Sequence, residues 1–151
     1  MTYHNLAGSL AAMTRFLPRG ILHLSIHVHL AFRQLGISIR SNIAQIKMPI
    51  DQSINLGVIL NEWISNAVKY AYPTATGEIR IELRVVEQDN AQLIVSDDGV
   101  GFDNGQKPQG TGFGTKIVNA MVISLAATTE YKSGHPGTIA VLTFPFKKFG
   151  V

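Results

Sequence analysis

The stretch NEWISNAVKY, residues 61–70 of this 151-residue chain, predicts a helix with two different sides. Glu62 and Asn66 are four residues apart, Lys69 follows three residues later, and Tyr70 comes directly after it. On a helix these spacings place the four side chains along one side. The remaining positions are largely apolar, so the segment predicts a helix that is buried on one side and polar on the other.

The apolar pattern extends this helix in both directions, to about residues 52–71, and Asp51 is a candidate N-cap. Residues at helical spacing predict its buried stripe: Leu56, Ile59, Leu60, Trp63 and Ala67. A helix of this length with one apolar stripe is expected to cover a sheet.

The polar side of the helix has the residue types of a site for a metal-bound polyphosphate. The Asn66 oxygen is a hard neutral ligand of the kind that suits Mg²⁺, which keeps several waters and bridges to phosphates. The Glu62 carboxylate can orient or deprotonate an attacking group, and Lys69 can neutralise phosphate charge. Taken alone, a Glu and an Asn at this spacing are more typical of a solvated helix face.

A second group of residues is DDGVG, residues 97–101, directly after the apolar run Leu93 to Val95. A carboxylate at the end of a buried strand, here Asp97, can accept a hydrogen bond from the exocyclic amine of a base. Gly99 and Gly101 allow a sharp turn and a close approach of a ligand. Alone, the pattern is more typical of a plain turn, because Asp and Gly dominate turns.

Glycines also precede the next predicted helix, in the run Gly110-Thr111-Gly112-Phe113-Gly114. Glycines before a helix expose successive N–H groups at the positive end of the helix dipole, which favours phosphate binding. The run does not follow the first strand of a βαβ unit and lacks Gly-Lys-Ser/Thr, so it is neither a dinucleotide fingerprint nor a Walker loop. Farther on, the Thr138 hydroxyl could share a water with a base-binding Asp97.

The order of the predicted elements favours an α+β fold. Helices are predicted over residues 5–16, 21–34, 52–71 and 115–126, and strands over residues 37–48, 78–87, 91–96, 127–133 and 137–146. We therefore expect a two-layer α/β sandwich with its helices packed on one face of a mixed, mostly antiparallel sheet.

The composition sets limits on the kind of protein. Hydrophobic residues make up 46% and charged residues 15%, which indicates a globular chain rather than a disordered one. The absence of cysteine excludes disulfides and thiolate metal sites, and we expect a cytoplasmic location. The net charge of +3 is too diffuse to indicate nucleic-acid binding. No apolar run reaches the roughly 18 residues that a membrane span requires.

The joint order of these motifs is more specific than any one of them. Glu-x-x-x-Asn-Ala, Asp-x-Gly-x-Gly, Gly-x-Gly-x-Gly and Gly-Thr, in this order, resemble the Bergerat-fold ATP-binding domain of gyrase, Hsp90, histidine kinases and MutL. The resemblance covers about residues 49–147. Within that superfamily, PIDQSINLGVILNEWISNAVKYAYP and VSDDGVGF look like the catalytic domain of a bacterial sensor histidine kinase. The eight residues between Gly101 and Gly110 are similar to the short ATP lid of kinases related to the HWE group.

The resemblance implies a role for each candidate residue. Asn66 would ligate Mg²⁺, Glu62 would be the general base or water-orienting carboxylate, and Lys69 and Tyr70 would lie near the phosphates or ribose. On the nucleoside side the implied ATP-binding residues are Asp97, which accepts from the adenine amino group, Gly99 and Gly101, which give it room, and Thr138, which supports it. Gly110, Gly112, Phe113 and Gly114 belong to the lid and phosphate loop.

The resemblance also implies a division of the chain. Residues 1–36 would be the end of a dimerisation and phosphotransfer hairpin, and residues 37–151 the ATP-binding catalytic domain. The box His-Arg-x-x-Asn-Asn-Leu, typical of the acceptor in this group, does not occur in the sequence. His23, His27 and His29 lie on a very apolar predicted helix, a setting typical of packed or surface histidines. We expect a histidine-bearing dimerisation domain and a response regulator as partners, and a homodimer formed through the N-terminal helices.

Three functions fit these motifs. The first is transfer of the γ-phosphate of Mg-ATP to a histidine of a two-component sensor kinase. The second is an anti-sigma-factor serine kinase of the same fold, a class in which Ala71-Tyr72-Pro73 and Gly101-Phe102-Asp103 would also fit. The third is a degenerate ATP-binding-like scaffold, against which the intact motifs at Asn66, Asp97 and the glycines argue.

Overall fold

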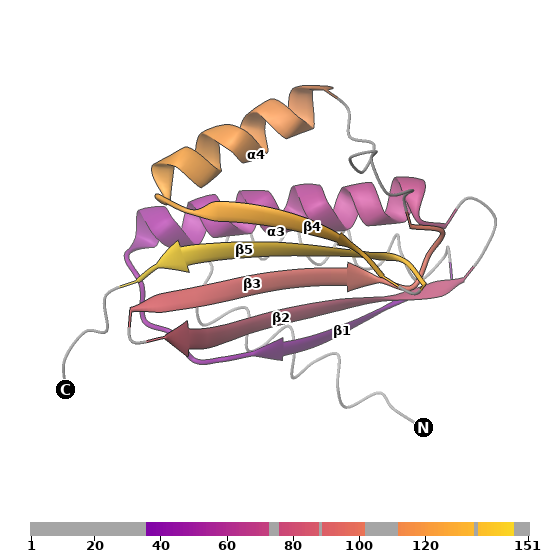
Figure 1. The fold of residues 1–151 in the computed structure, drawn as a ribbon, viewed down its shortest axis with the longest axis horizontal. Coiled ribbons are helices and arrows are strands. Elements are labelled where there is room, and N and C mark those ends of the chain that lie inside the picture. Colours follow the sequence, from indigo (N-terminus) through magenta and orange to yellow (C-terminus); the bar gives the residue numbers. More distant parts are fainter. Residues whose placement is uncertain (1–35, 73–75, 88, 102–111, 135, 147–151) are drawn as a thin grey trace.

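The computed structural model describes residues 36–72, 76–87, 89–101, 112–134 and 136–146. Within these ranges five strands form one sheet, in the order β1-β2-β3-β5-β4 (Figure 1). The strands are β1 (Ile37–Ile43), β2 (Gly77–Glu87), β3 (Asn90–Asp97), β4 (Thr128–Ser133) and β5 (Thr138–Pro145). The pairing of β1 with β2 is parallel, and the other three pairings are antiparallel. The predicted mixed, mostly antiparallel sheet is confirmed.

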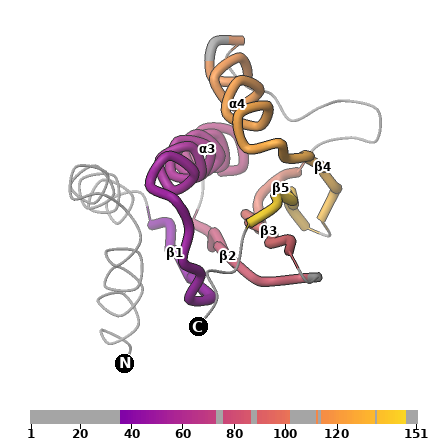
Figure 2. The backbone as a smooth tube through the Cα atoms, turned by 90° about the vertical axis from the view of Figure 1, so that its left-hand side faces the viewer, coloured from indigo at the N-terminus to yellow at the C-terminus, as the bar shows by residue number. Residues whose placement is uncertain are grey.

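Two helices complete the described fold, α3 (Ile50–Tyr70) and α4 (Gly112–Ser124). They lie on the same face of the sheet, with α4 beside α3 (Figure 2). The Asn55 amide donates to the Ser124 hydroxyl at 3.0 Å and links the two helices. The two-layer α+β architecture therefore agrees with the prediction. The helices predicted over residues 5–16 and 21–34 lie outside the described residues.

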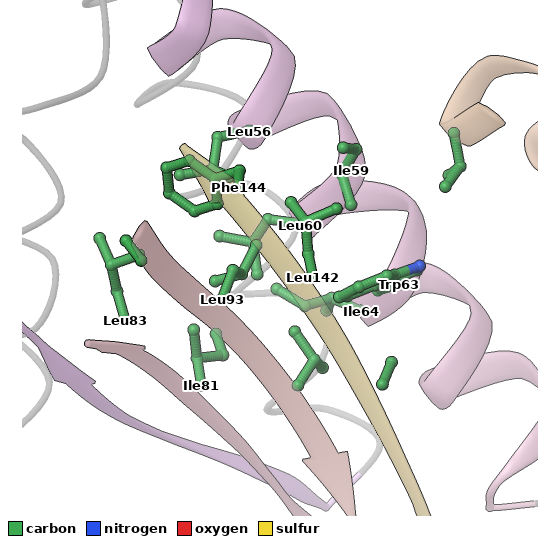
Figure 3. Close-up of a cluster of buried hydrophobic side chains, with 14 of the residues drawn as sticks. Leu56, Ile59, Leu60, Trp63, Ile64, Ile81, Leu83, Leu93, Leu142 and Phe144 are labelled. Atoms are coloured by element: carbon green, nitrogen blue, oxygen red, sulfur yellow. The ribbon is translucent and has the colours of Figure 1, made fainter. Parts of the chain in front are cut away.

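The core lies between α3 and the sheet. Every residue of the predicted helical stripe is buried, and Leu93, Leu142 and Phe144 meet the stripe from β3 and β5 (Figure 3). The strands supply these residues by alternation: in β3, Ala91, Leu93 and Val95 are buried and their neighbours are not. The side-chain periods of helix and strand thus converge on one apolar layer.

Trp63 connects this core to the edge of the sheet. Its indole N–H donates to the hydroxyl of Tyr131 on β4 at 3.1 Å, and the two rings meet edge to face with centroids 5.9 Å apart. Tyr131 is 38% exposed, so the aromatic pair extends from the buried helix stripe to the surface of the edge strand.

The opposite face of the sheet carries rows of polar side chains, beside the apolar pair Ile94 and Val141. Glu78 pairs through its two carboxylate oxygens with Arg40 of β1 and Arg80 of β2, at 2.6 Å each. Farther along, the Arg84 guanidinium donates to Gln92 at 2.9 Å, and the Gln92 amide donates to the Thr143 hydroxyl at 3.1 Å. These rows agree with the solvated face that the alternation of β2 predicts.

The structure corrects some predicted boundaries. The strand predicted over residues 37–48 ends at Ile43, and α3 begins at Ile50, with Pro49 rather than Asp51 as its N-cap. Pro49 has φ −55° and ψ 150°, the extended geometry that a residue before a helix adopts. Asp51 lies in the first turn instead, where its charge complements the helix dipole. Helix α4 begins at Gly112, three residues earlier than predicted.

None of the described helices combines the length and apolar character needed to cross a bilayer.

We predict that Tyr131→Phe lowers the free energy of unfolding by about 0.5–1.5 kcal/mol, because the change removes only the oxygen that accepts from Trp63. Urea unfolding measures the loss. In a Trp63→Phe background the same change should cost less, since the donor is already absent. Equal losses in both backgrounds would show that the hydrogen bond does not contribute.

Candidate functional site

The polar side of α3 divides into a partly buried half and an exposed half. Glu62 and Asn66 are partly buried, whereas Lys69 is exposed and Tyr70 is 37% exposed. The helix turns these four residues to one side, as their spacing predicts. Glu62 and Asn66 therefore lie closer to the interior than the cation and the phenol of the last turn.

The oxygen of Asn66 is a buried polar atom without a partner. Oδ1 is shielded from solvent and accepts no hydrogen bond within the described part of the chain. Such an atom costs free energy unless something coordinates it or donates to it. A divalent cation would meet that need, because a neutral amide oxygen is a suitable hard ligand.

The described residues could supply only part of the coordination shell of Mg²⁺, with phosphate oxygens and water supplying the rest. These residues contain no cluster of three or more His, Cys, Asp or Glu side chains able to hold a metal ion. Asn66 would then be one ligand beside phosphate oxygens and water, which is the usual coordination of Mg²⁺ in nucleotide sites. The residues present fit such an ion and do not form an all-protein cage.

Glu62 lies against the start of α4. A methyl group added at Gly114 would overlap with the Glu62 carboxylate, whereas one added at Gly112 would meet no atom within 4 Å. Gly114 is in the first turn of α4, whose N–H groups are not used within the helix. A glycine at position 114 therefore lets the positive end of α4 approach the carboxylate on α3.

Asp97 ends β3, and its carboxylate is held by backbone groups. Oδ1 accepts from the N–H of Gly99 at 3.0 Å and from the N–H of Thr138 at 3.3 Å. Oδ2 accepts no hydrogen bond from the described residues, so one oxygen is fixed and the other is available. Burial raises the pKa of Asp97, and the two N–H groups, which favour the charged form, offset that rise only in part.

Glycines let the neighbouring chain segments pack closely around Asp97. A side chain at Gly99 would overlap with the carbonyl oxygen of Ala71, directly after α3, and one at Gly137 would overlap with the carbonyl oxygen of Asp97. Gly101 and Gly137 have φ of 69° and 96°, which favours glycine. The N–H of Val100 also donates to the Ala71 carbonyl at 3.0 Å. The end of β3, the start of β5 and the end of α3 therefore meet at one point.

The structure brings the two predicted groups of residues close together. Asn66 precedes Ala71 by five residues, which is about 7 Å along a helix axis, and Ala71 touches Gly99. Thr138 contributes its N–H to Asp97, and the described hydrogen bonds do not use its hydroxyl.

Two of the predicted site residues cannot be placed. Gly110 lies outside the described residues, as does the side chain of Phe113, so their assignments to the lid and phosphate loop stay predictions.

Sequence reasoning did not assign Tyr72 or Asp98 to this region. The Tyr72 hydroxyl lies 2.7 Å from Asp98 Oδ1 and 2.9 Å from the Glu78 carbonyl oxygen, and it accepts from the Asp98 N–H at 3.2 Å. The Glu78 N–H donates to the same Asp98 oxygen at 2.8 Å. One signal in the sequence could have indicated a separate role for Asp98. Successive side chains of an extended chain point to opposite sides, so Asp98 is expected to point away from Asp97.

Comparison with known proteins identifies the class. The model of the histidine kinase-, DNA gyrase B-, and HSP90-like ATPase family matches residues 51–148. The chain belongs to this ATPase family, and the matched range contains α3 from its second residue onward, the end of β3 and the start of α4.

Individual relatives are histidine kinases. Blue-light-activated histidine kinase 2 of Erythrobacter litoralis is 22% identical over 148 residues, which cover 95% of this chain and 43% of that protein. The chain thus spans less than half of this curated relative. The solved histidine kinase domain of the Erythrobacter litoralis kinase EL346 has a TM-score of 0.68 at 22% identity, covering 80% of this chain and 58% of that one. The mycobacterial sensor histidine kinase MprB has a TM-score of 0.64 at 19% identity, covering 87% and 95%.

We predict that Gly114→Ala destabilises the contact between α3 and α4, because its methyl group displaces the Glu62 carboxylate. The overlapping atoms are the end of a flexible side chain that can move aside, so the expected loss in the free energy of unfolding is modest, about 1 kcal/mol relative to Gly112→Ala. Gly112→Ala is the matched control two residues away, and it should be neutral or stabilising by up to about 1 kcal/mol. Equal effects of the two changes in thermal unfolding would refute the close approach.

Proposed function

We propose that this chain is the ATP-binding catalytic domain of a two-component histidine kinase. In this proposal it binds Mg-ATP in the cytoplasm and donates the γ-phosphate to a histidine on a dimerisation hairpin. Residues 37–151 are the catalytic domain and residues 1–36 the end of the hairpin, through which two chains form a homodimer. A response regulator then receives the phosphate from that histidine.

The observation that carries the proposal is the arrangement of Asp97. Two backbone N–H groups hold Oδ1, and Oδ2 is available to accept from an exocyclic amine of adenine. The close packing at Gly99 and Gly137 restricts movement of the loop around this carboxylate. A fixed acceptor beside a buried strand end recognises adenine by its hydrogen-bonding pattern rather than by charge.

The phosphate side of the proposed site is the polar side of α3. Asn66 presents a shielded oxygen that lacks a partner in the described residues and would hold Mg²⁺. The ion, when bound, would neutralise charge on the β- and γ-phosphates. Lys69 and Tyr70 are both accessible in the last turn and would lie near the phosphates or ribose. Gly112 and Gly114 open α4 with N–H groups that the helix itself does not use.

The transfer step needs positioning more than covalent chemistry from the protein. A nitrogen of the acceptor imidazole forms a bond to the γ-phosphorus, the bond to the β–γ bridging oxygen breaks, and ADP leaves. Glu62 accepts a hydrogen bond from the other imidazole N–H and so orients the ring. The kinase gains its rate by holding these groups in line.

Two other functions are compatible with the same site. An anti-sigma-factor serine kinase would place a hydroxyl where the histidine kinase places an imidazole, and a degenerate scaffold would not transfer phosphate at all. The histidine-kinase relative that aligns over 95% of the chain favours the first proposal.

The proposal predicts the chemistry of the phosphorylated product. The chain is incubated with γ-labelled ATP, Mg²⁺ and a histidine-bearing dimerisation hairpin, with Asn66→Asp as the control variant. We expect label on the hairpin that survives alkali and is lost in acid, as a phosphoramidate is. Label with the reverse stability would instead support the serine kinase. Absence of ATP binding near millimolar concentrations would support the scaffold.

We predict that Asp97→Asn weakens Mg-ATP binding by about 1–3 kcal/mol, because an amide that partly donates would face the adenine amine. Isothermal titration calorimetry on the full chain measures the change. Gln92→Ala is the control on the same strand: it alters only the solvated face of the sheet and should leave the affinity unchanged. An affinity that is unaltered in Asp97→Asn would remove this residue from the site.

A further inference from the structure

Asp97 is not positioned by its own strand alone. Its Oδ1 accepts from the N–H of Thr138 on β5 and, at shorter distance, from the N–H of Gly99, so the direction of the carboxylate also depends on the path of the loop from residue 97 to residue 101. Two attachments hold that loop to neighbouring elements. One is the backbone hydrogen bond from Val100 to Ala71, and the other is the carboxylate of Asp98.

Asp98 connects the loop to β2 and to the residue that follows the C-cap of α3. Its Oδ1 accepts from the Glu78 N–H at 2.8 Å and from the Tyr72 hydroxyl at 2.7 Å. The Asp98 N–H in turn donates to the same hydroxyl at 3.2 Å. Both the main chain and the side chain of Asp98 are thus held by one phenol.

Tyr72 is well placed for this contact. Its ring lies over Gly77, where any side chain would overlap with ring atoms, and its position in the chain directly follows the C-cap Ala71 of α3. The Tyr72 hydroxyl carries one proton, shared between Asp98 and the Glu78 carbonyl oxygen, so it acts as a junction of α3, β2 and the loop. Burial and the bond to Asp98 raise the pKa of Tyr72, which keeps this proton in place.

We propose that Tyr72 and Asp98 are positioning residues for adenine recognition: through the loop that they hold, they set the direction of the Asp97 carboxylate. This inference rests on the proposed function, because it assigns the ligand of Asp97 as an adenine amine. Neither residue touches the nucleotide in this proposal. Both act on the base and not on the phosphates.

If Tyr72 and Asp98 act only on the base, their loss should weaken the binding of ATP more than that of inosine triphosphate, which has the same phosphates and ribose. Hypoxanthine carries a carbonyl oxygen where adenine carries its amine, so an acceptor instead of a donor would face the Asp97 carboxylate. The full chain with Mg²⁺ is titrated with ATP and with inosine triphosphate, and the ratio of the two dissociation constants reports the contribution of Asp97. The unaltered chain should prefer ATP.

Tyr72→Phe keeps the ring over Gly77 and removes only the hydroxyl. We expect the preference for ATP to fall by about three- to tenfold, the size of one lost hydrogen bond, with little change in the affinity for inosine triphosphate. In an Asp97→Asn background the same change should have no further effect on the ratio. Tyr131→Phe is the matched control: it also removes a tyrosine hydroxyl, but one on the edge strand β4 that accepts from Trp63, and it should keep the preference.

The outcomes distinguish the inference from the function on which it rests. A chain that binds neither nucleotide overturns the proposed function and this inference together. A preference for ATP that persists in Tyr72→Phe, or a loss of equal size for both nucleotides, overturns the inference alone. Should Tyr72→Phe fail to fold, Asp98→Ala provides the second variant at an exposed position: it removes the acceptor of both the Glu78 N–H and the Tyr72 hydroxyl, and a preference unchanged from that of the original chain would refute the inference.

Discussion

The contact between the end of β3 and the end of α3 is the constraint on which the candidate site depends. Gly99 lies against Ala71 so closely that no other residue fits, and the N–H of Val100 donates to the Ala71 carbonyl. A carbonyl at the end of a helix has no partner within the helix, so this donor satisfies a group that would otherwise need water. The same bond joins the helix that carries Asn66 to the strand that carries Asp97.

The hydrophobic core fixes the position of α3 on the sheet, and so the position of that contact. Helix α3 is held against the middle of the sheet by its apolar stripe, and Leu93 and Val95 belong to the strand that ends at Asp97. Close packing resists sliding of the helix along the sheet, because a small shift would lose many contacts at once. The separation between Asn66 and Asp97 is therefore set by apolar packing rather than by the polar residues themselves.

The periodicity of the sequence predicted the fold, but it could not predict contacts between residues that are far apart in the chain. The helical spacing of Leu56 to Ala67 predicted the buried side of α3, alternation predicted the solvated face of the sheet, and the order of the short motifs predicted the family. Asp51 has the residue type of an N-cap, yet Pro49 takes that position because its fixed φ suits the extended residue before the helix. The close approach of Gly114 to Glu62 joins residues more than fifty positions apart, and no local repeat encodes it.

Asp97 and Asp98 show how different surroundings at the end of one strand give two identical side chains different properties. The pKa of the first is raised because burial outweighs its two backbone donors, whereas the pKa of the second is lowered because the Glu78 N–H and the Tyr72 hydroxyl stabilise its charge with little burial. By linkage, Asp98 stabilises the fold above the usual carboxyl range and loses that contribution as the pH falls through its lowered pKa. Asp97 has the opposite sign: its folded form binds a proton more readily than the unfolded chain, so ionisation with rising pH disfavours the fold. A partly buried carboxylate kept at this cost agrees with the proposed role of Asp97 as a hydrogen-bond acceptor for a ligand.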